Sequence, residues 1–207
     1  VNSDGLDVAA LANAIKLADH GLKLADLVEL KQLFEHATTF GSLIQVPEGL
    51  AQKLPALRRL SELKGQDMLV AKALKTLEPL VRQAELLAAR YDDVVANPPY
   101  MGGKAMNALI KEFAKDHFPR SKSDLFSVST ERFMALAKPF GFSGLMTPFT
   151  WMFLKSYEAL RGLMVDVKSL HSLIQPEYHA FFESAYVPVC TFIVQNCQAP
   201  VSYTHLR

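Results

Sequence analysis

The chain has 207 residues, half of them hydrophobic, which suffices for one ordinary domain with a buried core or for part of a larger protein. Its 22 lysines and arginines nearly balance its 21 aspartates and glutamates, so no overall field gathers nucleic acid, although a local groove can still be basic. Two cysteines make no disulfide framework, which favours the reducing cytoplasm, and the six histidines show no metal-ligand spacing. No apolar run approaches the roughly 18 residues of a membrane span.

Residues 6–90 have the pattern of successive amphipathic helices. Apolar residues recur at three- and four-residue spacing over 6–37, where Gly21 marks a break between two helices. Residues 38–47 predict a non-helical connector, and Pro47 opens a second helical block. That block contains a stripe of leucines, namely Leu50, Leu54, Leu57, Leu60 and Leu63. Three further positions bend or interrupt helices, namely Pro55, Gly65 and Pro79.

From residue 91 the pattern changes to strands that alternate with helices. The first strand ends in Val94-Val95-Ala96 and is short and β-branched, which is typical of a buried strand. This alternation predicts an α/β fold with a mostly parallel sheet and helices on its faces. The expected helices span 107–118, 124–139 and 156–166, and the further strands span 141–152, 167–174 and 187–196.

The first strand runs straight into Asn97-Pro98-Pro99-Tyr100, at the carboxyl end of a strand, where α/β sheets place their ligands. Pro98 disfavours the α region for Asn97, and each proline fixes its own φ near about −65°. We therefore expect the side-chain carbonyl of Asn97 and the main-chain carbonyl of Pro98 to converge on one point. Two such acceptors suit a planar amino group, and Tyr100 offers a flat face to a heteroaromatic ring.

Hydrogen bonds to both amino hydrogens pull the nitrogen away from planarity and free its lone pair for attack on an electrophilic carbon. No base is needed beforehand, because the proton can leave after the nitrogen becomes cationic. The alternative for Asn97–Tyr100 is a simple strand-ending turn with an asparagine cap and two loop prolines.

The letters NPPY at 97–100 resemble the (D/N)PPY element of amino-methyltransferases that use S-adenosylmethionine. Enzymes that methylate a protein glutamine share these letters, and RNA guanine methyltransferases have related forms. The longer stretch "NPPYMGGK…SDLF" resembles the adenine-specific DNA methyltransferases of phage-exclusion (BREX-type) and related large restriction systems. The next element, "GFSGLMTPFTWMFLKSYEALRGLM", is similar to a strand-and-helix segment of that family, with Phe142 as a minor departure. The resemblance covers roughly residues 80–196.

This resemblance implies a partial Rossmann-like methyltransferase sheet in the C-terminal half, preceded by a helical segment. It further implies N6-methylation of an adenine that is flipped out of double-stranded DNA, with S-adenosylmethionine as the cofactor. Other subunits of a defence complex are the implied protein partners.

The resemblance also assigns roles to residues. Asn97 and Pro98 would accept the two amino hydrogens, and Tyr100 would stack on the extruded base. The stretch "AFFESAYVPVCTFIV" resembles the later element that brings a second aromatic ring to the base, for which Phe182 is the candidate and Phe181 the next.

Two weaker assignments concern the region after the motif. Asp124 lies where the family places residues near the cofactor, but it also precedes a helix and suits an N-cap. Lys104 follows two glycines and can approach a DNA phosphate, although an exposed loop lysine is an equal interpretation.

The sequence divides by these criteria into a helical spacer (1–90), the acceptor half of a catalytic domain (91–197) and a tail expected to be non-native (198–207). The family's glycine-rich cofactor loop, of the form D-P-(A/S)-C-G-(S/T)-G, does not occur in the 207 residues. We therefore expect a fragment that has the acceptor half of the site and binds S-adenosylmethionine weakly or not at all. The alternatives are a protein-glutamine or RNA-base amino-methyltransferase and a non-catalytic DNA-binding or scaffold subunit.

Overall fold

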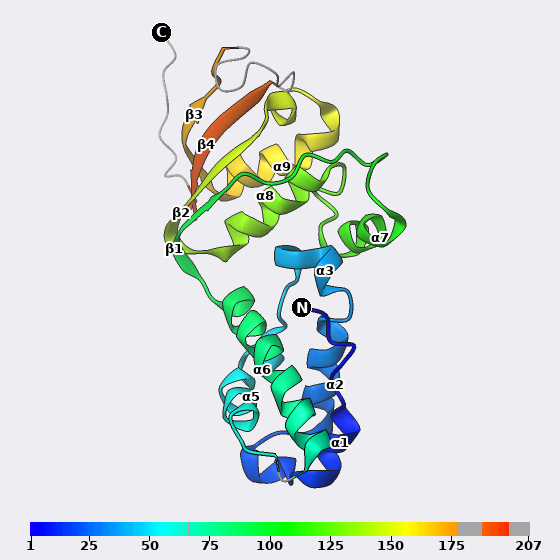
Figure 1. The fold of residues 1–207 in the computed structure, drawn as a ribbon. Helices are drawn as coiled ribbons and strands as arrows, with labels where there is room; N and C mark the ends of the chain where they lie inside the picture. The colour runs from blue at the N-terminus through cyan, green and yellow to red at the C-terminus, as the bar shows by residue number, and fades with distance from the viewer. Residues whose placement is uncertain (66, 178–187, 199–207) are drawn as a thin grey trace. The chain divides into compact units, whose positions relative to one another are not determined.

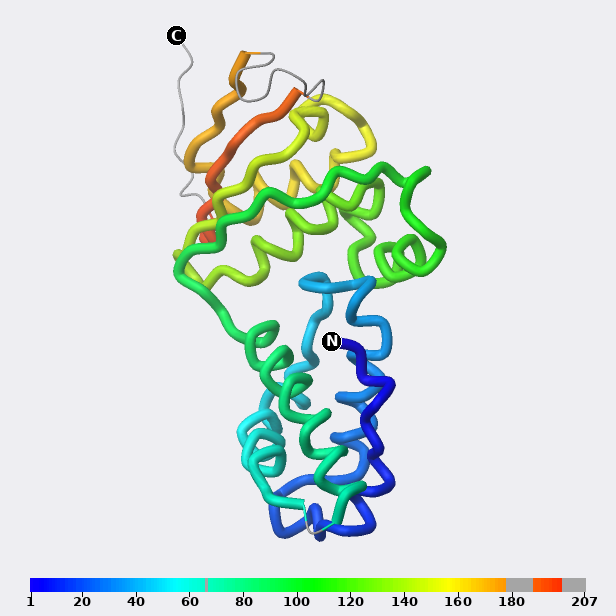
Figure 2. The backbone as a smooth tube through the Cα atoms, viewed as in Figure 1, coloured from blue at the N-terminus to red at the C-terminus, as the bar shows by residue number. Residues whose placement is uncertain are grey.

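The structure, a computed structural model, describes residues 1–65, 67–177 and 188–198. Its chain divides into two compact units, Val1–Ala89 and Arg90–Arg207. We call them the helical unit and the sheet unit after the elements that they contain (Figures 1 and 2). Each unit is described by itself.

The helical unit consists of short helices and one long one, as the apolar spacing predicts. Gly21, with φ +71°, ends the turn before α2, because only glycine adopts that left-handed conformation at little cost. The elements are α1 (Val8–Ala14), η1 (Leu17–His20), α2 (Leu24–Leu33), α3 (Ala37–Phe40), η2 (Gly41–Leu43), α4 (Glu48–Ala51), α5 (Leu54–Ser61) and α6 (Met68–Ala88).

One prediction for this unit needs correction. The connector expected at 38–47 is partly helical, because α3 and η2 extend to Leu43 before the chain becomes extended. α6 continues from Met68 to Ala88 with Pro79 inside it, and the kink expected there stays a prediction. Pro55 lies in the first turn of α5, where a missing N–H costs nothing, and so begins the helix rather than bends it.

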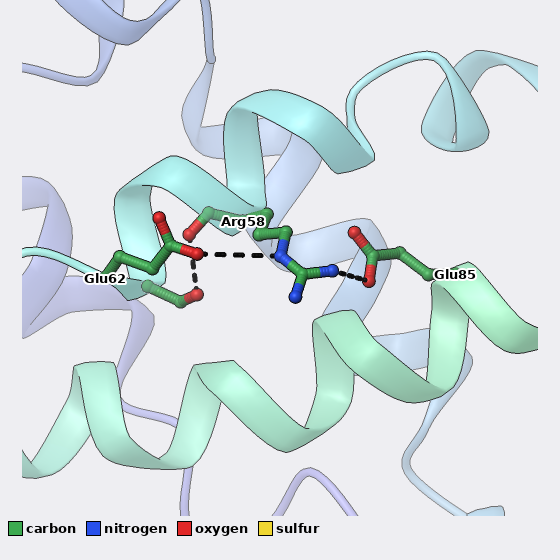
Figure 3. Close-up of polar contacts among 4 residues, drawn as sticks. Arg58, Glu62 and Glu85 are labelled. Carbon is green, nitrogen blue, oxygen red and sulfur yellow. Dashed lines mark hydrogen bonds and ion pairs between the residues drawn. The ribbon is translucent and has the colours of Figure 1, made fainter.

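The core of the helical unit is built from aliphatic side chains. Four leucines of the predicted stripe are buried, whereas Leu63, which follows the end of α5, is 40% exposed. The core also includes Leu27, Leu30 and Phe34 of the second helix region and Leu77 of α6. At the surface, Arg58 links α5 to α6 by an ion pair of 2.7 Å with Glu85, and it approaches Glu62 at 3.5 Å (Figure 3). The hydrogen bond to Glu85 raises the pKa of the Arg58 guanidinium above its ordinary value.

The sheet unit combines a four-stranded sheet with helices. Its described elements are β1 (Tyr91–Ala96), α7 (Ala108–His117), α8 (Leu125–Leu136), β2 (Ala137–Pro148), η3 (Phe149–Met152), η4 (Lys155–Tyr157), α9 (Glu158–Gly162), the π-helical turn η5 (Leu163–Val167), β3 (Ser169–Ile174) and β4 (Val189–Gln195). The strand order is β1-β2-β4-β3. The predicted α/β fold class is thereby confirmed.

The sheet is mixed, not mostly parallel as the sequence predicts. β1 and β2 are parallel, but β4 lies between β2 and β3 and is antiparallel to both. The prediction depends on a helix between successive strands, and the sequence shows none between β3 and β4, so the rule does not apply there. β2 also begins earlier than expected, at Ala137, and bulges around Phe140, which has φ +66°.

The helices cover one face of the sheet. Figure 1 shows α8 and α9 beside the strands, and Phe126 and Met134 of α8, Leu160 of α9 and Met164 of η5 form a core with Leu145 and the inward side chains of β4. On the other face, Val95 is 84% exposed and borders a hollow of about 500 Å³ over Gly144. β1 is therefore not the fully buried strand expected from its composition, because in the described residues only one of its faces is covered.

No helix in the ranges that the structure describes has the length and apolar content to cross a bilayer.

Candidate active site

The corner Asn97–Tyr100 begins where β1 ends. Ala96, the last residue of β1, is paired with Leu145 of the parallel strand β2, so the two strands leave the sheet at the same edge. Asn97 is exposed, Pro98 is buried and Tyr100 is 38% exposed. The corner thus presents the asparagine and the tyrosine at the surface, on a buried proline, at the edge where ligands bind in open α/β sheets.

The side chains of Asn97 and Tyr100 contact each other directly. The Tyr100 hydroxyl lies 2.9 Å from Oδ1 of Asn97 and 3.4 Å from the main-chain oxygen of Met146. The hydroxyl has one hydrogen, and the shorter distance favours donation to Asn97. Burial, followed by the nearby Cys190 thiol, raises the pKa of Tyr100 above its ordinary value, so the hydroxyl keeps its proton at neutral pH.

The ring of Tyr100 lies against a row of aromatic side chains. Its centroid is 6.5 Å from that of buried Phe126, with the planes at 86°, and Phe126 in turn lies 5.3 Å from Tyr157. An edge-to-face contact with a buried ring restricts how Tyr100 can tilt. The Cys190 thiol, which is also near Tyr100, accepts a hydrogen bond of 3.3 Å from Nε1 of Trp151.

Asp124 fixes the chain that leaves the corner. Its Oδ1 accepts hydrogen bonds from the N–H of Met101 at 3.2 Å and from the N–H of Phe126 at 3.0 Å. The main chain is paired as well, since the N–H of Leu125 donates to the Met101 oxygen at 3.0 Å and Gly102 bridges to Asp124. Burial raises the pKa of the Asp124 carboxyl above its ordinary value, and the backbone N–H donors oppose that rise.

The N-cap interpretation of Asp124 therefore matches the geometry, because the residue caps α8 with a capping box that includes Ser127. Its assignment to the cofactor stays a prediction. Lys104 is exposed in the loop after Gly103, and its phosphate contact also stays a prediction. Phe182 and Phe181 lie outside the described residues, so the structure does not place the second aromatic ring. The direction of the Pro98 carbonyl likewise stays a prediction.

Sequence reasoning missed the residues that surround the corner. Met146 of β2 and Cys190 of β4 lie near Tyr100 because of the way these strands pair in the sheet. Tyr157 comes from a later helical turn. Strand alternation could have placed Cys190 on the helix-covered face, because it shares that face with Phe192 and Val194. In the residues available for the search, no cluster of His, Cys, Asp and Glu is arranged to hold a metal ion.

Residues 13–182 match the Eco57I restriction-modification methylase family. The chain belongs to this family. The resemblance that NPPY and the following residues indicated is confirmed by this match and by the curated relatives.

Three relatives of this Eco57I-type chain carry informative names. The adenine-specific methyltransferase BrxX of Escherichia coli O9:H4 (strain HS) is 44% identical over 174 residues, which are 82% of this chain and 14% of BrxX. The adenine-specific methyltransferase PglX of Lacticaseibacillus casei (strain Zhang) is 42% identical over 88 residues, 42% of this chain and 7% of PglX. The type II restriction enzyme and methyltransferase RM.Eco57I of Escherichia coli is 24% identical over 178 residues, 77% of this chain and 17% of that enzyme.

The chain therefore spans only about a seventh of the length of BrxX, its 44% identical relative. Among solved structures, a chain from a type I R-M system aligns with 92% of this chain and 45% of its own length, at 14% identity. Its TM-score of 0.44 is too low to support an inference.

Proposed function

We propose that this chain forms the acceptor half of the active site of a longer DNA methyltransferase, which methylates N6 of a flipped adenine in double-stranded DNA for restriction-modification or phage defence. Residues 1–90 would be a helical spacer and residues 91–197 the acceptor half. The names of the relatives support adenine as the substrate, and the small share of their length that the chain spans supports a longer protein. Other subunits of a defence complex are the proposed protein partners.

The observation that carries this proposal is the exposed corner Asn97–Tyr100 at the carboxyl end of β1. There, Asn97 is exposed, and its Oδ1 accepts a hydrogen bond from the Tyr100 hydroxyl that restrains the side chain. We assign the two amino hydrogens of adenine to Asn97 Oδ1 and the Pro98 carbonyl oxygen. The ring of Tyr100, restrained by its edge-to-face contact with Phe126, would stack on the base.

These residues act on the amino nitrogen only. Two hydrogen bonds pull the amino group away from planarity, which takes the nitrogen lone pair out of conjugation with the purine ring and makes it available for attack. S-adenosylmethionine supplies the methyl group in the overall reaction, and one amino hydrogen leaves as a proton. Since the nitrogen becomes cationic before it loses that proton, the corner needs acceptors rather than a strong base, and it contains no histidine or lysine.

We expect the residues that the structure describes to form no complete cofactor site by themselves. Asp124, the one residue assigned to the cofactor, already accepts hydrogen bonds from two main-chain N–H groups, and no glycine-rich loop occurs in the sequence. We expect the isolated 207-residue chain to give no saturable heat in calorimetry at S-adenosylmethionine concentrations that saturate the full-length methyltransferase. Tight binding by the isolated chain would contradict the assignment of the acceptor half alone.

The test of the proposed function is Asn97→Ala in the full-length methyltransferase. Loss of one preorganised acceptor at the reacting nitrogen should lower the rate at least about a hundredfold, while DNA binding stays largely intact. The product is N6-methyladenine, measured by mass spectrometry after digestion of genomic DNA from a host that lacks this modification. Asn13→Ala, at an exposed position of α1, is the matched control and should keep the parent rate.

Methylation at a normal rate in Asn97→Ala would remove the corner from the reaction. A parent protein that methylates RNA or a protein glutamine but not DNA would favour those acceptors instead. A parent protein that binds DNA without any transfer would favour the non-catalytic subunit.

A further inference from the structure

The amide of Asn97 is chemically asymmetric at the point where it must accept a hydrogen. Its Oδ1 is an acceptor and its Nδ2 is a donor, and a half-turn about the last side-chain bond exchanges them with almost no change of shape. An amino group that meets Nδ2 faces a donor and gains nothing. The proposed reaction therefore depends on which of these two atoms points toward the base.

Among the described residues, the Tyr100 hydroxyl is placed to decide this orientation. The Tyr100 hydroxyl lies 2.9 Å from Oδ1 of Asn97, three residues away across the two prolines. It donates its single hydrogen there, because the other acceptor within reach, the Met146 oxygen, is at 3.4 Å. Amide oxygen has two lone pairs, so this hydrogen bond leaves one of them for an incoming amino hydrogen.

The geometry points to the hydroxyl of Tyr100 as a positioning group, which keeps Oδ1 of Asn97, rather than Nδ2, toward the acceptor amine. This role rests on the proposed function and is separate from the stacking role of the ring. The ring stacks through its face, whereas the hydroxyl lies in the ring plane, so both can act together. The edge-to-face contact with buried Phe126 restricts the tilt of the ring and hence the place of the hydroxyl.

The alternative arrangement makes the opposite prediction. If Asn97 were reversed, Nδ2 would donate to the Tyr100 hydroxyl, which would then donate to the Met146 oxygen. The hydroxyl would in that case hold the amide in its unproductive orientation. Its removal would then raise the rate or leave it unchanged.

The test is Tyr100→Phe in the full-length methyltransferase, with kcat and KM measured for unmethylated genomic DNA. The variant keeps the ring and loses the hydroxyl, so we expect kcat to fall about fivefold, the equivalent of one ordinary neutral hydrogen bond, with KM unchanged. Tyr91→Phe, which removes a hydroxyl at the other end of β1, is the matched control and should keep the parent kcat within about twofold. Equal unfolding midpoints of variant and parent protein, followed by circular dichroism, show that each variant is folded.

A second comparison separates orientation from packing. The carboxylate of Asn97→Asp has two equivalent acceptor oxygens, so its orientation does not matter. In that background, Tyr100→Phe should change kcat by less than about twofold. An equal fivefold loss in both backgrounds, or a Tyr100→Phe single variant with unchanged or raised kcat, overturns the positioning role. Neither result affects the proposed function, which is tested separately by Asn97→Ala and by the substrate of the parent protein.

Discussion

The helical unit and the sheet unit bury different kinds of side chain. Eight polar or charged side chains are buried in the ranges that the structure describes, and the helical unit contributes only Ser3. The sheet unit contributes the other seven, namely Ser121, Ser127, Ser129, Thr130, Arg132, Ser143 and Thr147. Four of these seven belong to α8, the helix that Asp124 caps.

This difference shows where the molecule needs defined geometry. Aliphatic packing stabilises a helix bundle without fixing any one atom closely, whereas a buried polar group must find its hydrogen-bond partners and so specifies their positions. Ser127 Oγ donates at 2.7 Å to the main-chain oxygen of Asp124, and Thr130 Oγ1 donates at 2.8 Å to the main-chain oxygen of Phe126. These contacts hold the start of α8, and through Asp124 they hold the corner that precedes Met101.

Arg132 is the extreme case among these side chains. It is 3% exposed, and burial, with a smaller contribution from the charge of Arg90, lowers its pKa to about 10. At neutral pH the guanidinium is therefore still charged inside α8. Removing a charged guanidinium from water costs free energy, which its interactions with the surrounding residues must offset.

The largest effects that test this comparison come from core truncations, one in each unit. Leu57→Ala in α5 and Leu160→Ala in α9 each remove a side chain with no exposed surface and should each cost about 2–5 kcal/mol of unfolding free energy. Urea unfolding of the 207-residue chain can be followed by two signals. Fluorescence reports on the sheet unit, because Trp151, the only tryptophan of the chain, lies there. Far-ultraviolet circular dichroism reports mainly on the helices.

We expect Leu57→Ala to shift the dichroism transition and Leu160→Ala to shift the fluorescence transition. Equal shifts of both signals by either variant would mean that the two units unfold together and that their cores are not separate.

The second comparison uses two aspartate N-caps. Asp67 caps α6 through one hydrogen bond, from the N–H of Val70 at 2.8 Å, so Asp67→Ala should cost about 1 kcal/mol. Asp124 caps α8 and also holds the N–H of Met101, so Asp124→Ala should cost about 2 kcal/mol. Denaturation of the isolated chain measures both, and equal costs would show that the Met101 contact contributes nothing.

The smallest expected effect is a pH dependence of the stability of the sheet unit. Because the pKa of Asp124 is raised on folding, the folded state binds more protons than the unfolded state just above the ordinary aspartate range. The contribution of this carboxyl to stability is thus present at low pH and is lost as pH rises through the raised pKa.

The measurement is the unfolding free energy from Trp151 fluorescence between about pH 4 and about pH 7, compared with Asp124→Asn. The amide variant keeps the Oδ1 acceptor but has no charge to bury, so its stability relative to the parent chain should rise with pH. A difference that is flat across this range would contradict the effect of burial.

The sequence predicts local features of both units well, because they depend on neighbouring residues. The spacing of Leu50, Leu54, Leu57 and Leu60 identifies a core stripe, and Asp124 before an apolar helix identifies a cap. The stripe fails at Leu63 because α5 ends at Ser61, and such helix ends are set by tertiary contacts as much as by the residues themselves.

Features that depend on distant residues were not predictable. The placement of β4 between β2 and β3 decides that the sheet is mixed and that Cys190 lies near Tyr100, yet no spacing in the sequence encodes it. Asn97 and Tyr100 are only three residues apart, but their contact also depends on two distant groups. These are the ring of Phe126, which packs against Tyr100, and the main-chain oxygen of Met146 in β2, which lies near its hydroxyl.

The outer strand β1 has a further consequence for how the protein behaves in solution. In the described residues β1 pairs with β2 alone, and its second half, Val94-Val95-Ala96, is apolar. Asp92 and Asp93 in its first half are exposed charges of the kind that deter other chains from adding to a free strand. The hydrogen bond from Lys138 lowers the pKa of Asp92, so this gatekeeper against intermolecular aggregation stays ionised further into the acid range than an isolated aspartate would.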